Sequence, residues 1–515
     1  MPNRAKLTQD LGWHDVAAGV SVAMVLIPQA MAYAELAGLP SQVGLFAAAL
    51  PPLLAAPFVS SPYLQTGPVA LTSLLTFGAL HNLAEPFSTD YVALAALLAL
   101  LVGAFRVALG AVGFGRIAYL LSAPVLTGFT TGAAILIVAS QFPSVVGFEK
   151  SGDGVLEEAF TALTSPGDWE LNTILFGVFT SALMVGGRRI NTLFPGVLIA
   201  VIASTLISNG IDYEGSVIGE LPGGFVDFRL DFPWGSAGQL LVAAIAIALV
   251  GFAEPSSIAR AFATAERQPW DANREMLGQG VANIAAAISG GFPVGGSFSR
   301  SALNRTAGAR TRWSGAVTGL VVLVSLPLTP LLEALPRAVL AALVITAVVK
   351  LIDLRRLWNL INESIPQTVV GVGTLVATLA FSPRVERGVL IGVGLAIGVH
   401  LYRELNDMSV DHDIDGTKMT VLPRGVLWFA TVPAIERIVR SELAANPEVD
   451  AVEFDLGGVG RLDYTGGATL EQVVKTLMEN GITISVCDVR PGAERAVRVF
   501  LTDALGIEPS HKTPE

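Results

Sequence analysis

The sequence has very few of the residues on which metal, redox or disulfide chemistry depends. Its 515 residues include one cysteine, Cys487, and five histidines, with no Cys-x-x-Cys pair and no His-Glu-x-x-His motif. This scarcity leaves a metal site, a redox centre and a disulfide framework without support. A phosphate-binding loop of the Gly-x-x-x-x-Gly-Lys-Ser/Thr type is also absent, which argues against a pump driven by ATP hydrolysis. We therefore expect no enzyme activity and no cofactor.

Charged residues are scarce too, at 15%, and they are unevenly distributed. Residues 407–515 hold 18 acidic and 10 basic side chains, whereas residues 1–406 hold 25 and 22. This balance argues against nucleic-acid binding and indicates an acidic soluble domain after a hydrophobic one. The N-terminal stretch MPNRAKLTQDLGWHD lacks the apolar core and cleavage site of a signal peptide, so we expect the N-terminus to be retained.

Hydrophobic residues are abundant, at 52% of the chain, and the mean hydropathy is +0.61. These values are typical of a polytopic membrane protein. Apolar runs long enough to cross a bilayer, or to cross it with an interruption, predict an all-α membrane domain of about fourteen spans. The runs begin near residues 14, 42, 65, 92, 118, 172, 193, 239, 276, 294, 313, 336, 366 and 386.

Basic residues indicate how these spans are oriented. With the N-terminus inside, the even-numbered connections hold most of the arginines and lysines, among them Arg116, Arg188, Arg267, Arg310 and Lys350. Each of the two long polar connections, residues 149–172 and 209–234, has one basic residue and falls outside. This pattern predicts a multi-pass protein of the bacterial inner membrane with both the N-terminus and the C-terminal domain in the cytoplasm.

Two pairs of segments indicate an internal repeat. The run AGVSVAMVLIPQAMAYAELAG places Pro28 inside a span, and AAIAIALVGFAEPSSIARAFA places Pro255 likewise. Gly67 follows the first proline by 39 residues and Gly296 follows the second by 41, each where a proline-containing extended segment meets a helix start. A repeat of seven spans would place the second copy upside down relative to the first, as an inverted 7+7 repeat.

This geometry explains why the hydrophobic chain contains SGGFPVGGSFSRSALNR, residues 289–305. Two half-helices would meet N-terminus to N-terminus at mid-membrane, where free N–H groups and partial positive charge form an anion site. Thr66, Ser297 and Ser299 would satisfy freed backbone groups, and Arg300 would add a full positive charge. The alternative is that Arg300 and Arg305 merely begin a cytoplasmic loop.

Two carboxylates inside apolar runs are candidates for proton coupling. Glu35 lies two helical turns after Pro28, and Glu254 immediately precedes Pro255. An acid inside the bilayer is costly when charged, so an acid facing the anion cavity is suited to carrying a proton. Glu35 could instead lie solvated at the outer end of its span, and Ser257 leaves a sodium site near Glu254 as an alternative.

The C-terminal part predicts an α/β domain of about 100 residues. Strands are expected at residues 420–431, 451–456 and 482–488, and helices at residues 432–446, 466–480 and 492–506. The loop GGVGRLDYTGG leads into a helix N-terminus that Asp463 or Thr465 can cap. Thr465 is also the candidate for regulatory phosphorylation, although ordinary capping is the stronger interpretation.

The segments LIPQAMAYAELAGLP, TGPVALTSLL, GGFPVGGSFSRSALNRTAGA and DLGGVGRLDYTGGATL together resemble the SulP anion transporters, also called solute carrier family 26, with their C-terminal STAS domain. The resemblance implies a membrane domain over residues 1–406 and a STAS domain over residues 407–515. It also implies a core of spans 1–4 and 8–11, a gate of spans 5–7 and 12–14, elevator-like alternating access and a homodimer. The STAS domain would be open to a regulatory protein, but Tyr464 replaces the usual small residue of its motif.

The resemblance also assigns a substrate site. Its residues here are Gln29, Tyr33, Gly67, Pro68, Val69, Ala70, Glu254, Ser297, Phe298, Ser299 and Arg300. The function we expect is proton-coupled import of a small anion, a dicarboxylate such as fumarate. The alternatives are a sodium-coupled bicarbonate or sulfate transporter and, from another class, an anion channel or a STAS-regulated scaffold.

Overall fold

A computed structural model describes residues 11–116, 122–149, 154–191, 193–221, 224–226, 228–406, 409–428 and 431–510. The chain forms two compact units, residues 1–396 and 397–515, which divide within helix α16 (Val385–Asn406). Each unit is described by itself below. The boundary at residue 406 and the grouping of the spans into core and gate stay predictions.

The first unit is almost entirely helical. A helix, or a short strand leading into one, begins within six residues of each predicted span position, and the number of bilayer crossings stays a prediction. The helices are α1 (Trp13–Leu36), α2 (Ser41–Ala55), α3 (Ala70–Leu80), α4 (Thr89–Ala111), α5 (Ala123–Val146), α6 (Val155–Thr164), α7 (Leu171–Ile190), α8 (Gly196–Gly210), α9 (Ala237–Ala265), α10 (Ala272–Ile288), α11 (Phe298–Thr306), α12 (Trp313–Ser325), α13 (Arg337–Val348), α14 (Leu354–Glu363), α15 (Ile365–Ala380) and α16.

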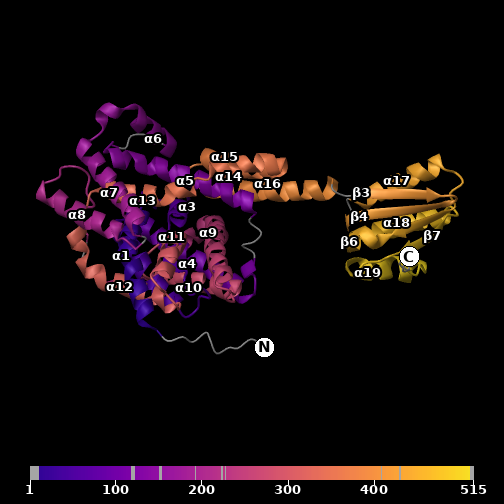
Figure 1. The fold of residues 1–515 in the computed structure, drawn as a ribbon, viewed down its shortest axis with the longest axis horizontal. Coiled ribbons are helices and arrows are strands. Elements are labelled where there is room, and N and C mark those ends of the chain that lie inside the picture. The colour runs from indigo at the N-terminus through magenta and orange to yellow at the C-terminus, as the bar shows by residue number, and fades with distance from the viewer. Residues whose placement is uncertain are drawn as a thin grey trace. The chain divides into compact units, whose positions relative to one another are not determined.

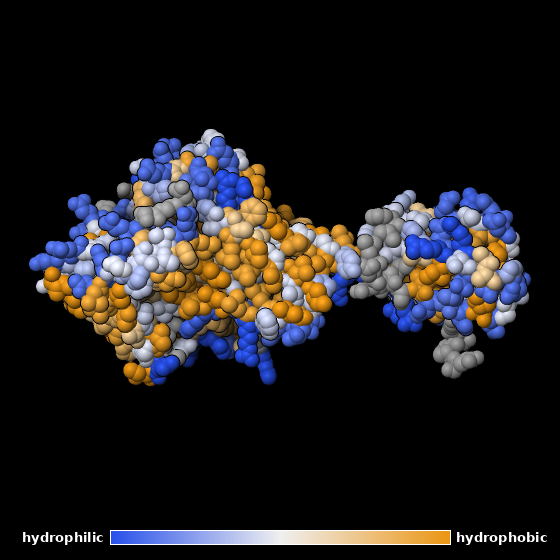
Figure 2. Space-filling model, turned by 90° about the horizontal axis from the view of Figure 1, so that it is seen from above, coloured by the Kyte–Doolittle hydropathy of each residue, from blue (hydrophilic) through white to orange (hydrophobic). Residues whose placement is uncertain are grey.

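Six of these segments are long and apolar enough to cross a membrane, and five more are shorter and apolar. The outer surface agrees with a lipid environment. On α7, Leu171, Leu175 and Val178 recur at helical spacing and are each more than half exposed. Figure 2 shows hydrophobic residues over the middle of this unit and hydrophilic residues along its edges.

Glycines let the helices of this unit approach one another closely. Gly103 in α4 faces Gly280 in α10, and a Cβ on either glycine would lie 2.9–3.0 Å from the carbonyl oxygen of the other. A Cβ on Gly128 in α5 would lie even closer to the carbonyl oxygen of Gly371 in α15. Small residues at such contacts are typical of helix packing in membranes, where van der Waals contact replaces the hydrophobic effect.

The two predicted copies of one element are present. Helices α1 and α9 continue through Pro28 and Pro255. Strand β1 (Gln65–Gly67) precedes α3, and strand β2 (Gly295–Ser297) precedes α11. The two strands pair antiparallel, with Gln65 opposite Ser297 and Gly67 opposite Gly295. The pairing has the inverted relation that the sequence predicts.

The second unit is an α/β domain with its own core. Its strands are β3 (Ser409–Asp415), β4 (Lys418–Leu427), β5 (Ala451–Asp455), β6 (Val459–Leu462) and β7 (Thr483–Cys487), in the order β3-β4-β5-β7 with β6 also paired to β4. Helices α17 (Val432–Ala445), α18 (Tyr464–Glu479) and α19 (Pro491–Val497) pack beside this sheet (Figure 1). The three predicted helices and three predicted strands are present, and β3 and β6 are additional.

Candidate functional site

The helix N-termini of α3 and α11 meet at the β1–β2 pair. Because the strands are antiparallel, the helices that follow them leave from opposite ends of the ladder. Ser297 is the N-cap of α11, and its hydroxyl accepts a hydrogen bond from the Arg300 backbone N–H at 3.5 Å. Gly67 has φ of 156°, a conformation that residues with a side chain rarely adopt.

A cavity of about 600 Å³ lies at these helix starts. It is lined by the first residues of both half-helices, Val69, Ala70 and Leu71 in one and Ser297, Phe298 and Ser299 in the other. Helix α1 contributes Gln29 and Tyr33, and α9 contributes Glu254. Further lining residues come from α7, α8, α13 and the turn that follows α13, and include Met184, Val197, Thr346, Val348 and Lys350.

Arg300 is buried next to this cavity. Its Nη2 donates to the Pro68 carbonyl at 2.8 Å and its Nη1 to Gln29 Oε1 at 3.4 Å. Among the described residues, none accepts a hydrogen bond from its Nε. Glu254 and Tyr33 both lie within electrostatic reach of the guanidinium. The structure thus places a cation with one unsatisfied donor beside two helix N-termini.

Of the two candidate carboxylates, the structure brings only Glu254 to the cavity. Glu35 lies near the end of α1, where Oε1 accepts a hydrogen bond from the Ser41 hydroxyl at 2.7 Å. Arg337 Nε lies 3.9 Å from the same oxygen. Glu35 is not among the residues that line the cavity, so its contacts join the end of α1 to the starts of α2 and α13.

Several residues that hold the strands in place were not singled out from the sequence. The Gln65 backbone N–H donates to Ser301 Oγ at 2.9 Å, and Thr66 Oγ1 accepts from Gln279 Nε2 at 2.8 Å. Asn283 bonds both the N–H and the carbonyl of Val294, just before β2. The amide side chains of Gln279 and Asn283 inside the apolar run GQGVANIAAAIS could have indicated these contacts, because buried polar groups need hydrogen-bond partners.

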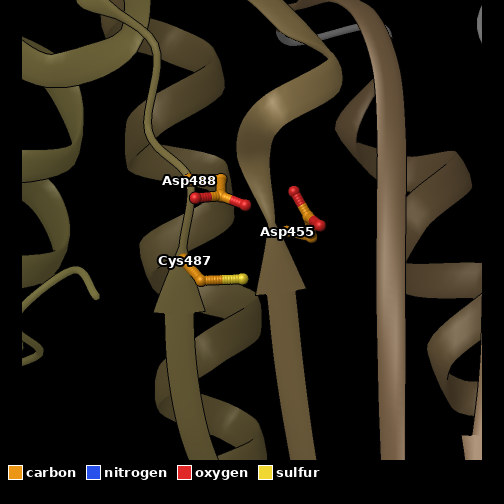
Figure 3. A group of neighbouring side chains, drawn as sticks. All are labelled: Asp455, Cys487 and Asp488. Carbon is orange, nitrogen blue, oxygen red and sulfur yellow. The ribbon is translucent and has the colours of Figure 1, made fainter. Parts of the chain in front are cut away.

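The second unit contains another group of polar side chains. Asp455, Cys487 and Asp488, at the ends of β5 and β7, offer ligand atoms within 4.8 Å of one another (Figure 3). Asp455 Oδ1 also accepts from the Gly457 N–H at 2.9 Å, an ordinary cap of the short helix that follows β5. Nearby in sequence, Asp463 caps α18 through the Gly466 N–H at 2.6 Å, and Thr465 is exposed at the start of that helix.

Comparisons with known proteins identify the family. The profile of the sulfate permease family matches residues 13–374, and that of the STAS domain matches residues 409–512. The chain belongs to the sulfate permease family. It is therefore a membrane anion transporter with a STAS domain, and the family consists of transporters rather than enzymes.

Relatives and solved structures agree with the membership. The chain is 34% identical to probable sulfate transporter 4.2 of Arabidopsis thaliana, covering 92% of this chain and 76% of the relative. It is 32% identical to a probable sulfate transporter of Mycobacterium tuberculosis, covering 96% and 92%. The fold matches that of the murine solute carrier 26 member A9 anion transporter in its inward-facing state, with a TM-score of 0.87 at 21% identity over 96% and 89% of the two chains. The membrane domain of the cyanobacterial bicarbonate transporter BicA matches with a TM-score of 0.63 at 23% identity, covering 75% of this chain and 97% of BicA.

Proposed function

We propose that this sulfate permease family member imports a small divalent anion together with a proton. One arrangement carries the proposal: two helix N-termini and Arg300 converge beside a cavity that also contains Glu254. The helix N-termini and the guanidinium attract the anion, and the Glu254 carboxylate takes up a proton when the anion binds.

Anion binding follows from the polar groups around Arg300. The first turns of α3 and α11, where N–H groups have no intrahelical partner, line the same cavity, and the Arg300 Nε has no acceptor among the described residues. A buried donor without a partner is costly, so an oxyanion that accepts from it would recover a charge-assisted hydrogen bond. Gln29 and Ser299 would complete the contacts to the anion, and Phe298 and Tyr33 would shape the cavity.

The names of the relatives support sulfate as the anion. A dicarboxylate such as fumarate is the second candidate, because a cavity of about 600 Å³ has room for a four-carbon anion as well as for sulfate. Bicarbonate, which the name of BicA suggests, is singly charged and would engage the two N-termini less strongly.

Glu254 supplies the coupling in this proposal. When Glu254 and Arg300 are both charged, they offset one another, and the site attracts an anion less strongly than when Glu254 carries a proton. A proton on Glu254 restores the positive charge of the site, so that anion and proton bind together and leave together. Sodium coupling is the competing arrangement, with a cation in place of the proton.

Transport would use movement of one group of helices against another. The cavity lies between α1, α3, α9 and α11, which we assign to the moving core, and α7, α8 and α13, which we assign to the gate. This division supports elevator-like alternating access in a homodimer of the inner membrane with both termini in the cytoplasm. The STAS domain would then be the place for a regulatory protein, with phosphorylation of Thr465 as one input.

The test is uptake by proteoliposomes that contain the purified protein. Radiolabelled sulfate, fumarate and bicarbonate are offered separately, each with and without an inward proton gradient and with and without sodium. Uptake of sulfate or fumarate that requires the proton gradient is the expected result. Uptake driven by sodium alone, or an anion current that needs no coupling gradient, would contradict the proposal.

A further inference from the structure

Arg106 is a second fully buried cation of the membrane unit, and it lies outside the cavity. It belongs to α4, has no exposed surface, and donates three hydrogen bonds to backbone carbonyls. Nε bonds Ala248 at 3.1 Å, Nη2 bonds Ile247 at 3.0 Å and Nη1 bonds Val294 at 3.1 Å. Within the described parts of the chain, no carboxylate forms an ion pair with it.

Carbonyl dipoles satisfy the donors of Arg106 but leave its net charge unbalanced. Burying a charge without a counter-charge is among the most costly arrangements in a protein. A neutral glutamine could donate two hydrogen bonds to the same carbonyls without that cost. An ionisable side chain inside a membrane domain is by default a candidate for a functional role, so the charge itself calls for a role.

The three carbonyls place this charge directly behind the anion site. Val294 is the residue before β2, and Ile247 lies two turns before Glu254 on α9. A Cβ added at Gly251 would lie 2.7 Å from Arg106 Nη2 and 3.3 Å from Cγ2 of Thr72, which is in the first turn of α3. Gly251 is thus close both to the guanidinium and to the N-terminal turn of α3.

Building on the proposed function, we propose that the charge of Arg106 strengthens binding of the anion. Arg106 does not touch the anion and acts on it across Gly251 and the backbone of Ile247 and Val294. Arg300 and Glu254 offset each other whenever both are charged, whereas Arg106 has no such partner among the described residues and keeps the site net positive. Coulomb energy is proportional to the charge of the anion. The free energy that Arg106 contributes to binding is therefore twice as large for a divalent anion as for a monovalent one.

The test compares probes of similar shape and different charge. Dissociation constants are measured by isothermal titration for sulfate and methyl sulfate, and for fumarate and its monoamide, with the full-length protein. In Arg106→Gln we expect roughly fivefold weaker binding of the monovalent probe and roughly 25-fold weaker binding of the divalent one. Arg106→Lys keeps the charge, so the ratio of the two constants should match that of the wild type.

Asn283→Ala is the matched control, because Asn283 bonds the same Val294 carbonyl at 3.1 Å but carries no charge. A purely structural disturbance of β2 should raise the dissociation constants of both probes of a pair by the same factor. Equal factors in Arg106→Gln would overturn the proposal. If that variant does not fold, Arg106→Met, a neutral side chain of similar length, replaces it. Equal factors for the two probes of a pair in Arg106→Met would also overturn the proposal.

These outcomes separate this inference from the proposed function. A wild-type protein that binds none of the four probes contradicts the proposed site itself. A wild-type protein that binds a probe pair while Arg106→Gln changes both constants equally leaves the anion site in place and removes only the role of Arg106.

Discussion

Replacing Arg300 by glutamine should weaken anion binding by one to two orders of magnitude. The guanidinium is buried, its Nε has no acceptor among the described residues, and Nη2 is held by the Pro68 carbonyl at 2.8 Å. An oxyanion that accepts from Nε gains a hydrogen bond to a charged group, worth about 1.5–3 kcal/mol. Losing it corresponds to a dissociation constant about 10- to 150-fold larger.

The assay is sulfate and fumarate uptake by proteoliposomes, with binding measured in detergent in case transport is lost. Arg305→Gln is the matched control: it lies on the same helix, is exposed and pairs with Glu266 at 2.8 Å. We expect less than about a twofold effect there, because exposed ion pairs contribute little. An apparent affinity in Arg300→Gln equal to that of the wild type would refute the assignment of Arg300 to the site.

Three further predictions follow from other contacts. Glu254→Gln should bind and exchange anions but lose stimulation of uptake by an inward proton gradient; stimulation equal to that of the wild type would remove Glu254 from coupling. Gly280→Leu should lower the melting temperature in detergent, because a Cβ there already lies 2.7 Å from the Val107 backbone, and overpacking costs about 1–3 kcal/mol. Gly394→Leu, where a Cβ meets nothing within 4 Å, is its control. Asp463→Ala should lower the urea-unfolding free energy of residues 397–515 by about 1 kcal/mol through loss of the α18 cap, while Asp463→Asn should retain most of it; equal losses in both would argue against capping.

The parts of the fold that could be predicted from the sequence are those determined by short stretches of neighbouring residues. Apolar runs of membrane length predicted where the helices begin, and the repeated proline and glycine spacing predicted that Gly67 and Gly296 lie in corresponding extended segments. The register of β1 and β2, with Thr66 opposite Gly296, was not predictable, because pairing between distant segments depends on the whole helical unit.

Residues that act through distant partners were missed for the same reason. Arg106 stands in the apolar run LLVGAFRVALG and was not singled out from the sequence. Its acceptors come from α9 and from the residue before β2, so no local pattern marks it. Strand β3 was missed because its sequence SVDHDID is rich in acid, a composition common on edge strands, which β3 is. Glu35 was included as a cavity residue on helical spacing alone, and the structure instead places it against Ser41 and Arg337.

The pairing of β1 with β2 has a consequence for how the protein is made. Gln65 to Gly67 are translated and inserted with the first half of the chain, whereas their partners Gly295 to Ser297 emerge only with the second. Until then the backbone groups of β1 lack the ladder that satisfies them at membrane depth. The proposed anion site would therefore be completed late in synthesis, because it needs strands from both halves of the chain.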